Sequence, residues 1–244
     1  MSHFFTVVLV QDTEPDDPNR DSILEGRVEN LLACYNEDIQ VDAYEEDCYC
    51  VGQEARRESQ EKALQEMEIG DTIADYREWF WSLKVDERPD WDDFLGALST
   101  LQSKYLQERD DIDSPNPECD SCHGTGIRMT TYNPLSKWDW WVIGGRWDGA
   151  IQGEYRESHD HGFNFGEEHH QIEYNSIPVE KLPEEFYPFA IVTPDGVWHE
   201  KGEMGWFGMA TNEQQDSVWL DEVRSIIEQY KNRRIVAIGC DLHI

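Results

Sequence analysis

The sequence has few basic side chains and no long apolar run. Lys and Arg account for 20 of its 244 residues, against 52 Asp and Glu, so the formal net charge at pH 7 is −32. Attraction to nucleic-acid backbone or to an anionic membrane through the general surface field needs positive charge, so we expect neither. No apolar run approaches the ~18 residues of a membrane-spanning helix. The opening MSHFFTVVLVQDTEP also lacks the basic start and cleavage site of a secretory signal. We therefore expect a cytoplasmic protein.

Common catalytic and nucleotide-binding signatures are also missing. The chain contains no Walker loop, dinucleotide fingerprint, G-x-S-x-G, H-E-x-x-H or EF-hand calcium loop. The acidity itself leaves three interpretations open. It can reflect a solvated surface, a decoy that mimics nucleic acid and occupies a basic groove on a partner, or a Ca²⁺-binding surface.

The aromatic content indicates a folded protein. Ten Trp among 29 aromatic residues are too many for a disordered acidic tail, and a chain of this length can bury a sizeable core. β-Branched runs and helical spacing predict strand–helix at one end and strand–strand–helix–strand at the other. The expected strands are 4–10, 188–193, 197–201 and 234–239, and the expected helices are 23–32 and 219–230.

This order predicts an α+β fold. We expect a ferredoxin-like α/β sandwich built from residues 1–50 and 123–244, with the two terminal strands as neighbours in one sheet. Residues 51–122 form the expected insertion, which is mostly helical. Its predicted helices are 53–67, 72–83 and 90–107.

Four of the six cysteines form two close pairs at the ends of this insertion. Cys119 and Cys122 have the Cys-x2-Cys spacing that places two thiolates on one side of a tight turn, and Cys48 and Cys50 can supply the two further ligands of a tetrahedral Zn²⁺. His123 is a substitute ligand. Free thiols and a disulfide or redox pair are the alternatives, although Cys-x-Cys is poor geometry for a local disulfide. The remaining two cysteines, 34 and 240, are expected to be core thiols.

Residues 138–149 (WDWWVIGGRWDG) are the least generic stretch of the chain. Two aromatic arms around Gly144 and Gly145 predict a β-hairpin with a type I′ turn. Backbone N–H groups of these glycines beside Arg146, with Trp141 and Trp147 nearby, also form a candidate pocket for a small anionic ligand.

Two resemblances bear on these motifs. Residues 119–126 (CDSCHGTG) resemble a single zinc-binding repeat of DnaJ-type co-chaperones, which implies metal binding but, since that family uses several repeats, not chaperone activity. Together with YNP at 132–134, SKWDWW at 136–141 and IGGRW at 143–147, they resemble a segment of uncharacterised proteins of tailed phages and some bacteria. That resemblance implies a phage or mobile-element setting and carries no established activity.

Four histidines lie within a short loop. His159, His161, His169 and His170, with neighbouring carboxylates, contain the donors that a catalytic Zn²⁺, Mn²⁺ or Fe²⁺ site uses. The alternatives are a surface cluster without a ligand, and a structural or pH-sensing role.

The sequence therefore predicts a zinc-stabilised acidic binding protein of phage or mobile-element origin. It would sequester a small anionic ligand or inhibit a basic host protein. The alternative is a metal-dependent hydrolase that uses the loop from His159 to His170. The oligomeric state stays open.

Overall fold

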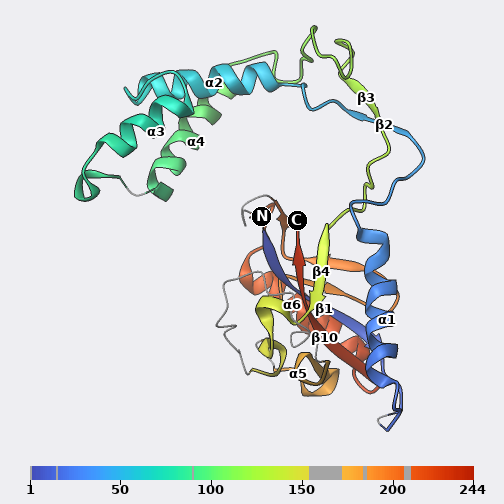
Figure 1. The fold of residues 1–244 in the computed structure, drawn as a ribbon. Coiled ribbons are helices and arrows are strands. Elements are labelled where there is room, and N and C mark those ends of the chain that lie inside the picture. Colours follow the sequence, from blue (N-terminus) through green and yellow to red (C-terminus); the bar gives the residue numbers. More distant parts are fainter. Residues whose placement is uncertain (1, 15, 90, 154–171, 184–185, 206–209) are drawn as a thin grey trace. The chain divides into compact units, whose positions relative to one another are not determined.

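A computed structural model of the chain describes residues 2–14, 16–89, 91–153, 172–183, 186–205 and 210–244. The chain divides into two compact units, one formed by Met1–Val41 with Tyr132–Ile244 and the other by Asp42–Thr131 (Figure 1). The sequence predicts boundaries at 50/51 and 122/123, so the second unit extends further at both ends than expected. Its added segments contain the strands β2 (Tyr44–Asp47) and β3 (Ile127–Thr130), which pair with each other and not with the large sheet. All four cysteines of the predicted metal site therefore lie within the second unit.

The first unit contains a mixed sheet and its flanking helices. The strands of this unit are β1 (His3–Gln11), β4 (Trp140–Ile143), β5 (Ser176–Pro178), β6 (Ala190–Val192), β7 (Trp198–Glu200), β8 (Glu203–Met204), β9 (Ala210–Thr211) and β10 (Ile235–His243). Of these, β8 and β9 pair with each other in a separate two-stranded sheet. Its α-helices are α1 (Arg20–Leu32), α5 (Ile172–Asn175) and α6 (Asp216–Tyr230). Short 3₁₀ turns occupy Ala33–Tyr35, Gly145–Trp147, Ala150–Gln152 and Val179–Lys181.

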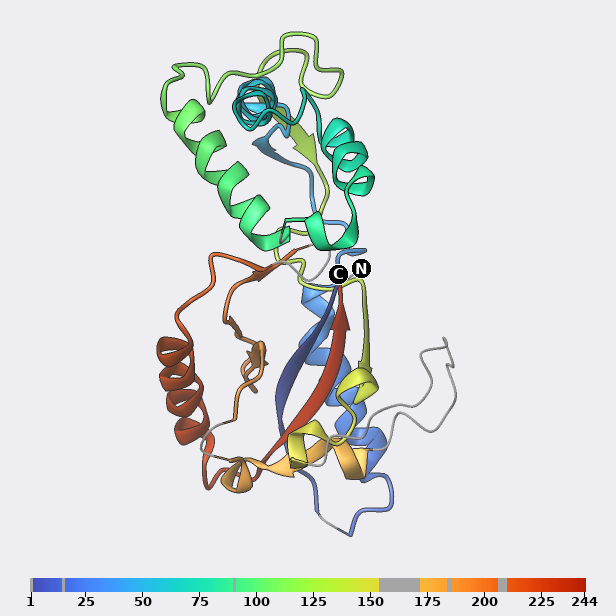
Figure 2. The same ribbon diagram turned by 90° about the vertical axis from the view of Figure 1, so that its left-hand side faces the viewer.

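The two terminal strands form the centre of this sheet. The strand order is β4-β10-β1-β6-β7, and β5 also pairs with β10. β1 and β10 are antiparallel along their whole length, from His3 opposite His243 to Gln11 opposite Ile235, while β6 runs parallel to β1. Figure 2 shows these two strands side by side, with both chain ends at the same end of the sheet. The predicted pairing of the terminal strands is confirmed.

The sheet is covered on both faces. Leu24, Val28 and Leu32 recur on α1 at helical spacing and pack in one core with Val8 and Ile238. A second core on the other face contains α6 residues such as Trp219 and Val223, which pack with Val7 and Ala237. Successive strand residues point to opposite faces, which explains why the interior of β1 is apolar at every position except Thr6 and does not alternate.

The α+β class is confirmed, but the ferredoxin-like sandwich is not. A two-layer sandwich has its helices on one face of the sheet, whereas here α1 and α6 cover opposite faces. In addition, β6 pairs directly with β1, so no strand separates the two as a split βαβ unit would require.

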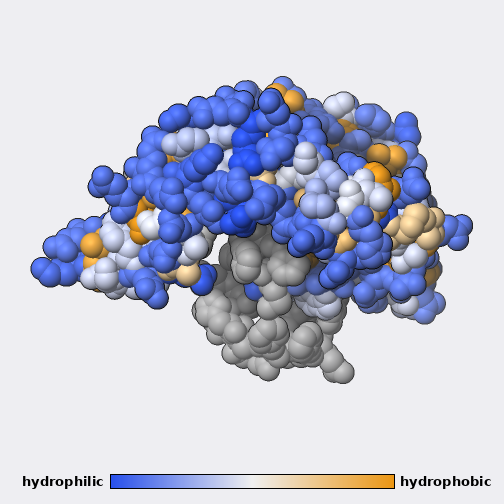
Figure 3. Space-filling view, turned by 90° about the horizontal axis from the view of Figure 1, so that it is seen from above, coloured by the Kyte–Doolittle hydropathy of each residue, from blue (hydrophilic) through white to orange (hydrophobic). Residues whose placement is uncertain are grey.

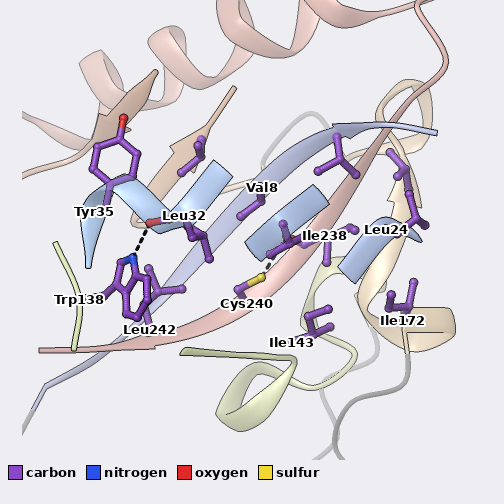
Figure 4. Packing of buried hydrophobic residues seen from close by; sticks show 14 of the residues in the cluster. Val8, Leu24, Leu32, Tyr35, Trp138, Ile143, Ile172, Ile238, Cys240 and Leu242 are labelled. Carbon is purple, nitrogen blue, oxygen red and sulfur yellow. Dashed lines mark hydrogen bonds between the residues drawn. The ribbon is translucent and has the colours of Figure 1, made fainter. Parts of the chain in front are cut away.

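The core under α1 is shown in Figure 4. The indole Nε1 of Trp138 donates a hydrogen bond of 3.0 Å to the carbonyl oxygen of Leu32, so a Trp from the segment before β4 fixes the C-terminal end of α1. Cys240 lies in this core and has no exposed surface, as predicted. Cys34 is exposed, so its prediction as a core thiol is wrong. It follows α1 on the 3₁₀ turn of Ala33–Tyr35, where the helical repeat that placed it on the apolar face no longer applies.

The second unit combines a two-stranded ribbon with three helices. The ribbon is β2 (Tyr44–Asp47) paired antiparallel with β3 (Ile127–Thr130). The helices are α2 (Gln53–Glu66), α3 (Ile73–Ser82) and α4 (Trp91–Gln107), with a 3₁₀ turn at Val85–Glu87, so all three predicted helices are confirmed. No helix in the described parts of either unit is long and apolar enough to cross a membrane.

The helical core of the second unit is small. Its fully packed members are Ala63, Leu64, Tyr76, Phe94 and Leu98, and the rings of Tyr76 and Phe94 stack at 3.6 Å between centroids. A core of this size gives limited stability by itself, and domains of this kind commonly depend on a further cross-link or metal.

Candidate metal centre and the Trp-Gly segment

The two cysteine pairs meet in the second unit. The Sγ atoms of Cys48, Cys50, Cys119 and Cys122 all lie within 4.8 Å of one another, and all four residues are buried. The Cys48–Cys119 sulfur distance is 3.7 Å and the Cys50–Cys122 distance is 3.4 Å. The structure thus brings together the four ligands that the spacing predicted, from positions about seventy residues apart.

The first cysteine pair is positioned by the end of the ribbon. β2 ends at Asp47, and the next residue, Cys48, donates its N–H to the carbonyl of Gly126 at 2.7 Å, which continues the pairing of the two strands. The chain then turns, with the Val51 N–H donating to the Cys48 carbonyl at 2.9 Å. This turn places the Cys48 and Cys50 side chains on the same side of the backbone, just before α2 begins.

The second cysteine pair lies on a tight turn whose backbone conformation depends on Gly124. The N–H of His123 donates to the Cys119 carbonyl at 2.7 Å, and both His123 and Gly124 have positive φ. A Cβ on Gly124 would lie 3.1 Å from backbone atoms of Pro117, so a larger residue does not fit there without displacement. The turn directs Cys119 and Cys122 to the first pair, while the exposed His123 is not part of the four-sulfur cluster.

The surroundings of the sulfurs favour a bound cation. Backbone N–H groups of Cys122 and Ser121 lower the pKa of the Cys119 thiol to about 6, because they stabilise its thiolate. Burial has the opposite effect on Cys50 and raises the pKa of its thiol to about 12. Four thiolates in one buried cluster repel each other, and a cation between them relieves this repulsion.

The sulfur separations match a metal site better than a disulfide. A disulfide requires about 2.05 Å between sulfurs, well below the two distances in the cluster, and all six cysteines are free. With a Zn–S bond of about 2.3 Å, the edge of a ZnS₄ tetrahedron is about 3.8 Å. The four cysteines therefore form a group that can hold a metal ion.

The Trp-Gly segment, residues 138–149, does not form the predicted hairpin. β4 is followed by Gly144, at φ +76°, and then by the 3₁₀ turn of Gly145–Trp147, so no second strand returns along β4. β4 pairs with β10, and the turn packs over that strand instead. A Cβ on Gly145 would lie 2.6 Å from the Cβ of Asp241, which shows how closely the backbone approaches.

Two backbone N–H groups of this segment donate to acceptors inside the protein. The Gly144 N–H donates to the carbonyl of Gly239 at 2.9 Å, and the Arg146 N–H donates to a carboxylate oxygen of Asp241 at 3.0 Å. The Arg146 residue is exposed. A buried carboxylate thus accepts the Arg146 backbone N–H, and the Arg146 guanidinium remains a candidate contact for an anion.

The two tryptophans of the predicted pocket lie on different faces of the sheet. Trp141 packs against the core under α1, whereas the Trp147 ring lies 5.6 Å from that of Phe5, beside the α6 core. The structure therefore brings Gly144, Gly145 and Arg146 together beside β10 but separates Trp141 from Trp147.

Sequence reasoning missed a cluster of titratable side chains at the end of the central strands. His3 and His243 are cross-strand partners, and each contacts a carboxylate, of Asp241 and Asp139 respectively. Positions 3 and 243 come together only through the register of β1 against β10. The one signal in the sequence is that each terminal strand has a histidine at its outer end.

The predicted histidine site lies outside the described residues. His159, His161, His169 and His170 all fall within 154–171, so the structure does not test a metal there.

No family model matches the chain, and comparisons with curated proteins and with solved structures found no similar protein.

Proposed function

We propose that the protein binds one structural Zn²⁺ through Cys48, Cys50, Cys119 and Cys122. The observation that carries this proposal is the convergence of four buried sulfurs within 4.8 Å. Zn²⁺ suits a tetrahedral set of four thiolates, whereas hard ions such as Mg²⁺ and Ca²⁺ prefer oxygen ligands. Four cysteine ligands leave no open coordination position, so the ion has a structural role and not a catalytic one.

The zinc would connect the ribbon to the helices of the second unit. Cys48 and Cys50 lie between β2 and α2, while Cys119 and Cys122 lie between α4 and β3. A metal bound here joins the two ends of the helical segment. It adds to the stability that the small core of the three helices provides.

We further propose that the protein binds a basic partner protein through its acidic surface. The second unit contains 23 acidic and 9 basic side chains, a net charge of −14. Five of its basic residues are in ion pairs within the unit, namely Arg57, Lys84, Lys104, Arg109 and Arg128. The described residues on the face in Figure 3 are mainly hydrophilic, with hydrophobic residues scattered among them. Such a surface favours a partner attracted by charge.

We favour a basic protein over a small anionic ligand, because the Gly144 N–H is used within the protein and Trp141 lies on a different face of the sheet from Trp147. The hydrolase alternative stays a prediction for the segment from His159 to His170. A phage or mobile-element origin and a location in the cytoplasm remain proposals, and the first is supported by the resemblance of residues 119–149.

Metal analysis tests the zinc proposal. Purified protein should contain about one zinc per chain, and Cys119→Ser with Cys122→Ser should remove it. Cys34→Ser is the matched control, because Cys34 is exposed and belongs to the first unit. Protein without zinc, or full zinc content in the double variant, would overturn the proposal.

Charge removal tests the partner proposal. Glu78, Asp86, Glu108 and Asp110 are exposed and form no ion pair with any described residue, so E78Q, D86N, E108Q and D110N together reduce the negative charge of the second unit. A matched set in the first unit is E25Q, E29Q, D38N and E180Q. Immobilised wild-type protein should retain proteins of high pI from a bacterial extract and release them as salt is raised. The first set should reduce this retention more than the second. Equal retention by all three proteins would contradict a role for the acidic second unit.

A further inference from the structure

A second group of metal-ligating side chains lies at the end of the central strands, apart from the cysteine cluster. His3 on β1 and His243 on β10 are directly opposite each other in the antiparallel register. Cross-strand partners point to the same face of a sheet. The two imidazole rings are in contact, with 4.9 Å between centroids and 66° between ring planes.

Each imidazole is held by a carboxylate. Nδ1 of His3 lies 2.9 Å from Oδ1 of Asp241, and Nδ1 of His243 lies 2.5 Å from Oδ1 of Asp139. With Nδ1–H donated to a carboxylate, Nε2 carries the lone pair of the neutral ring. The structure shows no hydrogen bond from the described residues to either Nε2. A carboxylate that orients one ring nitrogen while the other remains available is the arrangement found around metal-ligating histidines.

The Trp-Gly segment builds the surroundings of this histidine pair. Asp139 immediately precedes β4, and the Trp140 ring lies 6.0 Å from the His3 ring. The Arg146 N–H holds Asp241, whose side chain is only 2% exposed and therefore cannot turn away from His3. The segment that stands out in the sequence thus positions both carboxylates, and their negative charge favours a cation at this place over an anion.

The ring separation is compatible with a shared ion. With a metal–nitrogen bond of about 2.0–2.1 Å and a tetrahedral angle, two imidazoles on one ion have centroids about 5 Å apart. Nitrogen donors of this kind select Zn²⁺, Ni²⁺ or Cu²⁺ over Mg²⁺ and Ca²⁺.

We propose that His3 and His243 bind one divalent transition-metal ion through their Nε2 atoms. The ion keeps open coordination positions for water or another ligand, and it exchanges readily because the chain supplies two ligands in place of four. This site is independent of the cysteine cluster and does not rest on the proposed zinc function.

Calorimetric titration with Ni²⁺ tests the proposal, using full-length protein whose cysteine site already holds its metal. We expect one further Ni²⁺ per chain at this site. H3A with H243A should abolish that binding, while H199A should retain it. His199 is the matched control, because its Nδ1 also contacts a carboxylate, that of Glu222, but no second described histidine packs against its ring.

Two further variants separate this site from other sources of binding. The variant H159A/H161A/H169A/H170A removes the four histidines between 159 and 170 and should leave the Ni²⁺ binding at His3 and His243 intact. D139N should weaken binding about 10- to 100-fold, since it removes the carboxylate that orients His243. Circular dichroism establishes that each variant is folded, and H3Q and H243Q replace the alanine variant if it is not. Binding that survives loss of His3 and His243, or that disappears when only the four histidines between 159 and 170 are removed, would overturn the proposal. So would wild-type affinity in D139N.

Discussion

Removal of zinc should unfold the second unit and leave the first unit folded. Cys50 and Cys122 are 72 positions apart, so a metal that bridges them closes a long loop that contains all three helices of the unit. A cross-link that closes a loop of this length stabilises the folded state by about 4 kcal/mol in the chain-entropy description. Among the described side chains, five well-buried residues and a few partly buried ones form the helical core, which gives the unit little reserve when that contribution is lost.

Hydrogen exchange measures this effect unit by unit. A loss of about 4 kcal/mol in the stability of the unit corresponds to roughly 10³-fold faster exchange of those amides that exchange only when the unit unfolds. We expect that acceleration in α2 and α4 after chelation of the metal, and in the C119S/C122S variant without a chelator. Amides of β1 and β10 serve as the internal reference, because these strands pair with each other and lie in the first unit.

The exposed Cys34 provides the control for this experiment. C34S should exchange like the wild type in every segment, since Cys34 takes no part in the cluster. If α2 and α4 keep their protection once the metal is removed, the three helices fold without it. Neither loop closure by the metal nor the small size of the core would then limit the stability of the unit.

Three further predictions concern stability. Trp219→Ala should lower the free energy of unfolding by about 3–5 kcal/mol in urea denaturation. The reason is that the Trp219 side chain has no exposed surface and its indole donates a 2.7 Å hydrogen bond within the core. A loss below ~1 kcal/mol would contradict this packing. Gly145→Ala should lower the free energy of unfolding by about 1–3 kcal/mol more than Gly153→Ala does in the same assay. Both glycines have positive φ, but only a Cβ at position 145 meets neighbouring described atoms. Equal losses in the two variants would refute the close approach at Gly145. The pKa of Asp75 is lowered by the hydroxyl and N–H of Thr72, so its contribution to stability is present above the unfolded pKa of ~4 and is lost as pH falls through the folded pKa. D75N should therefore flatten the acid limb of the stability curve for the second unit, and an unchanged limb would exclude this linkage.

The elements of the fold could be predicted because local patterns determine them. The run FFTVVLV in β1, the helical spacing in α1 and α6, and the amphipathic repeat of α4 each reflect the backbone period of the element that they form. The Cys-x2-Cys spacing predicted a metal site for the same reason, since a tight turn between the two residues is local geometry.

The arrangement of these elements was not contained in local patterns. An apolar run predicts a buried strand without telling which face each helix covers, and the sheet proved to have α1 and α6 on opposite faces. Gly144 and Gly145 fit a type I′ hairpin, but pairing of β4 with β10 directs the chain over Asp241 instead. A turn is decided by what the flanking strands pair with, and that partner lies about a hundred residues away.

The sequence by itself determined the acidic charge, the main helices and terminal strands, and the four cysteines that can hold a metal. The tertiary structure alone decided where the second unit begins, how the Trp-Gly segment is used, and that His3 and His243 are neighbours. The physical reason is distance along the chain. Charge, helical period and cysteine spacing are properties of a few consecutive residues, whereas the register of β1 against β10 joins the two ends of the chain through packing on both faces of one sheet.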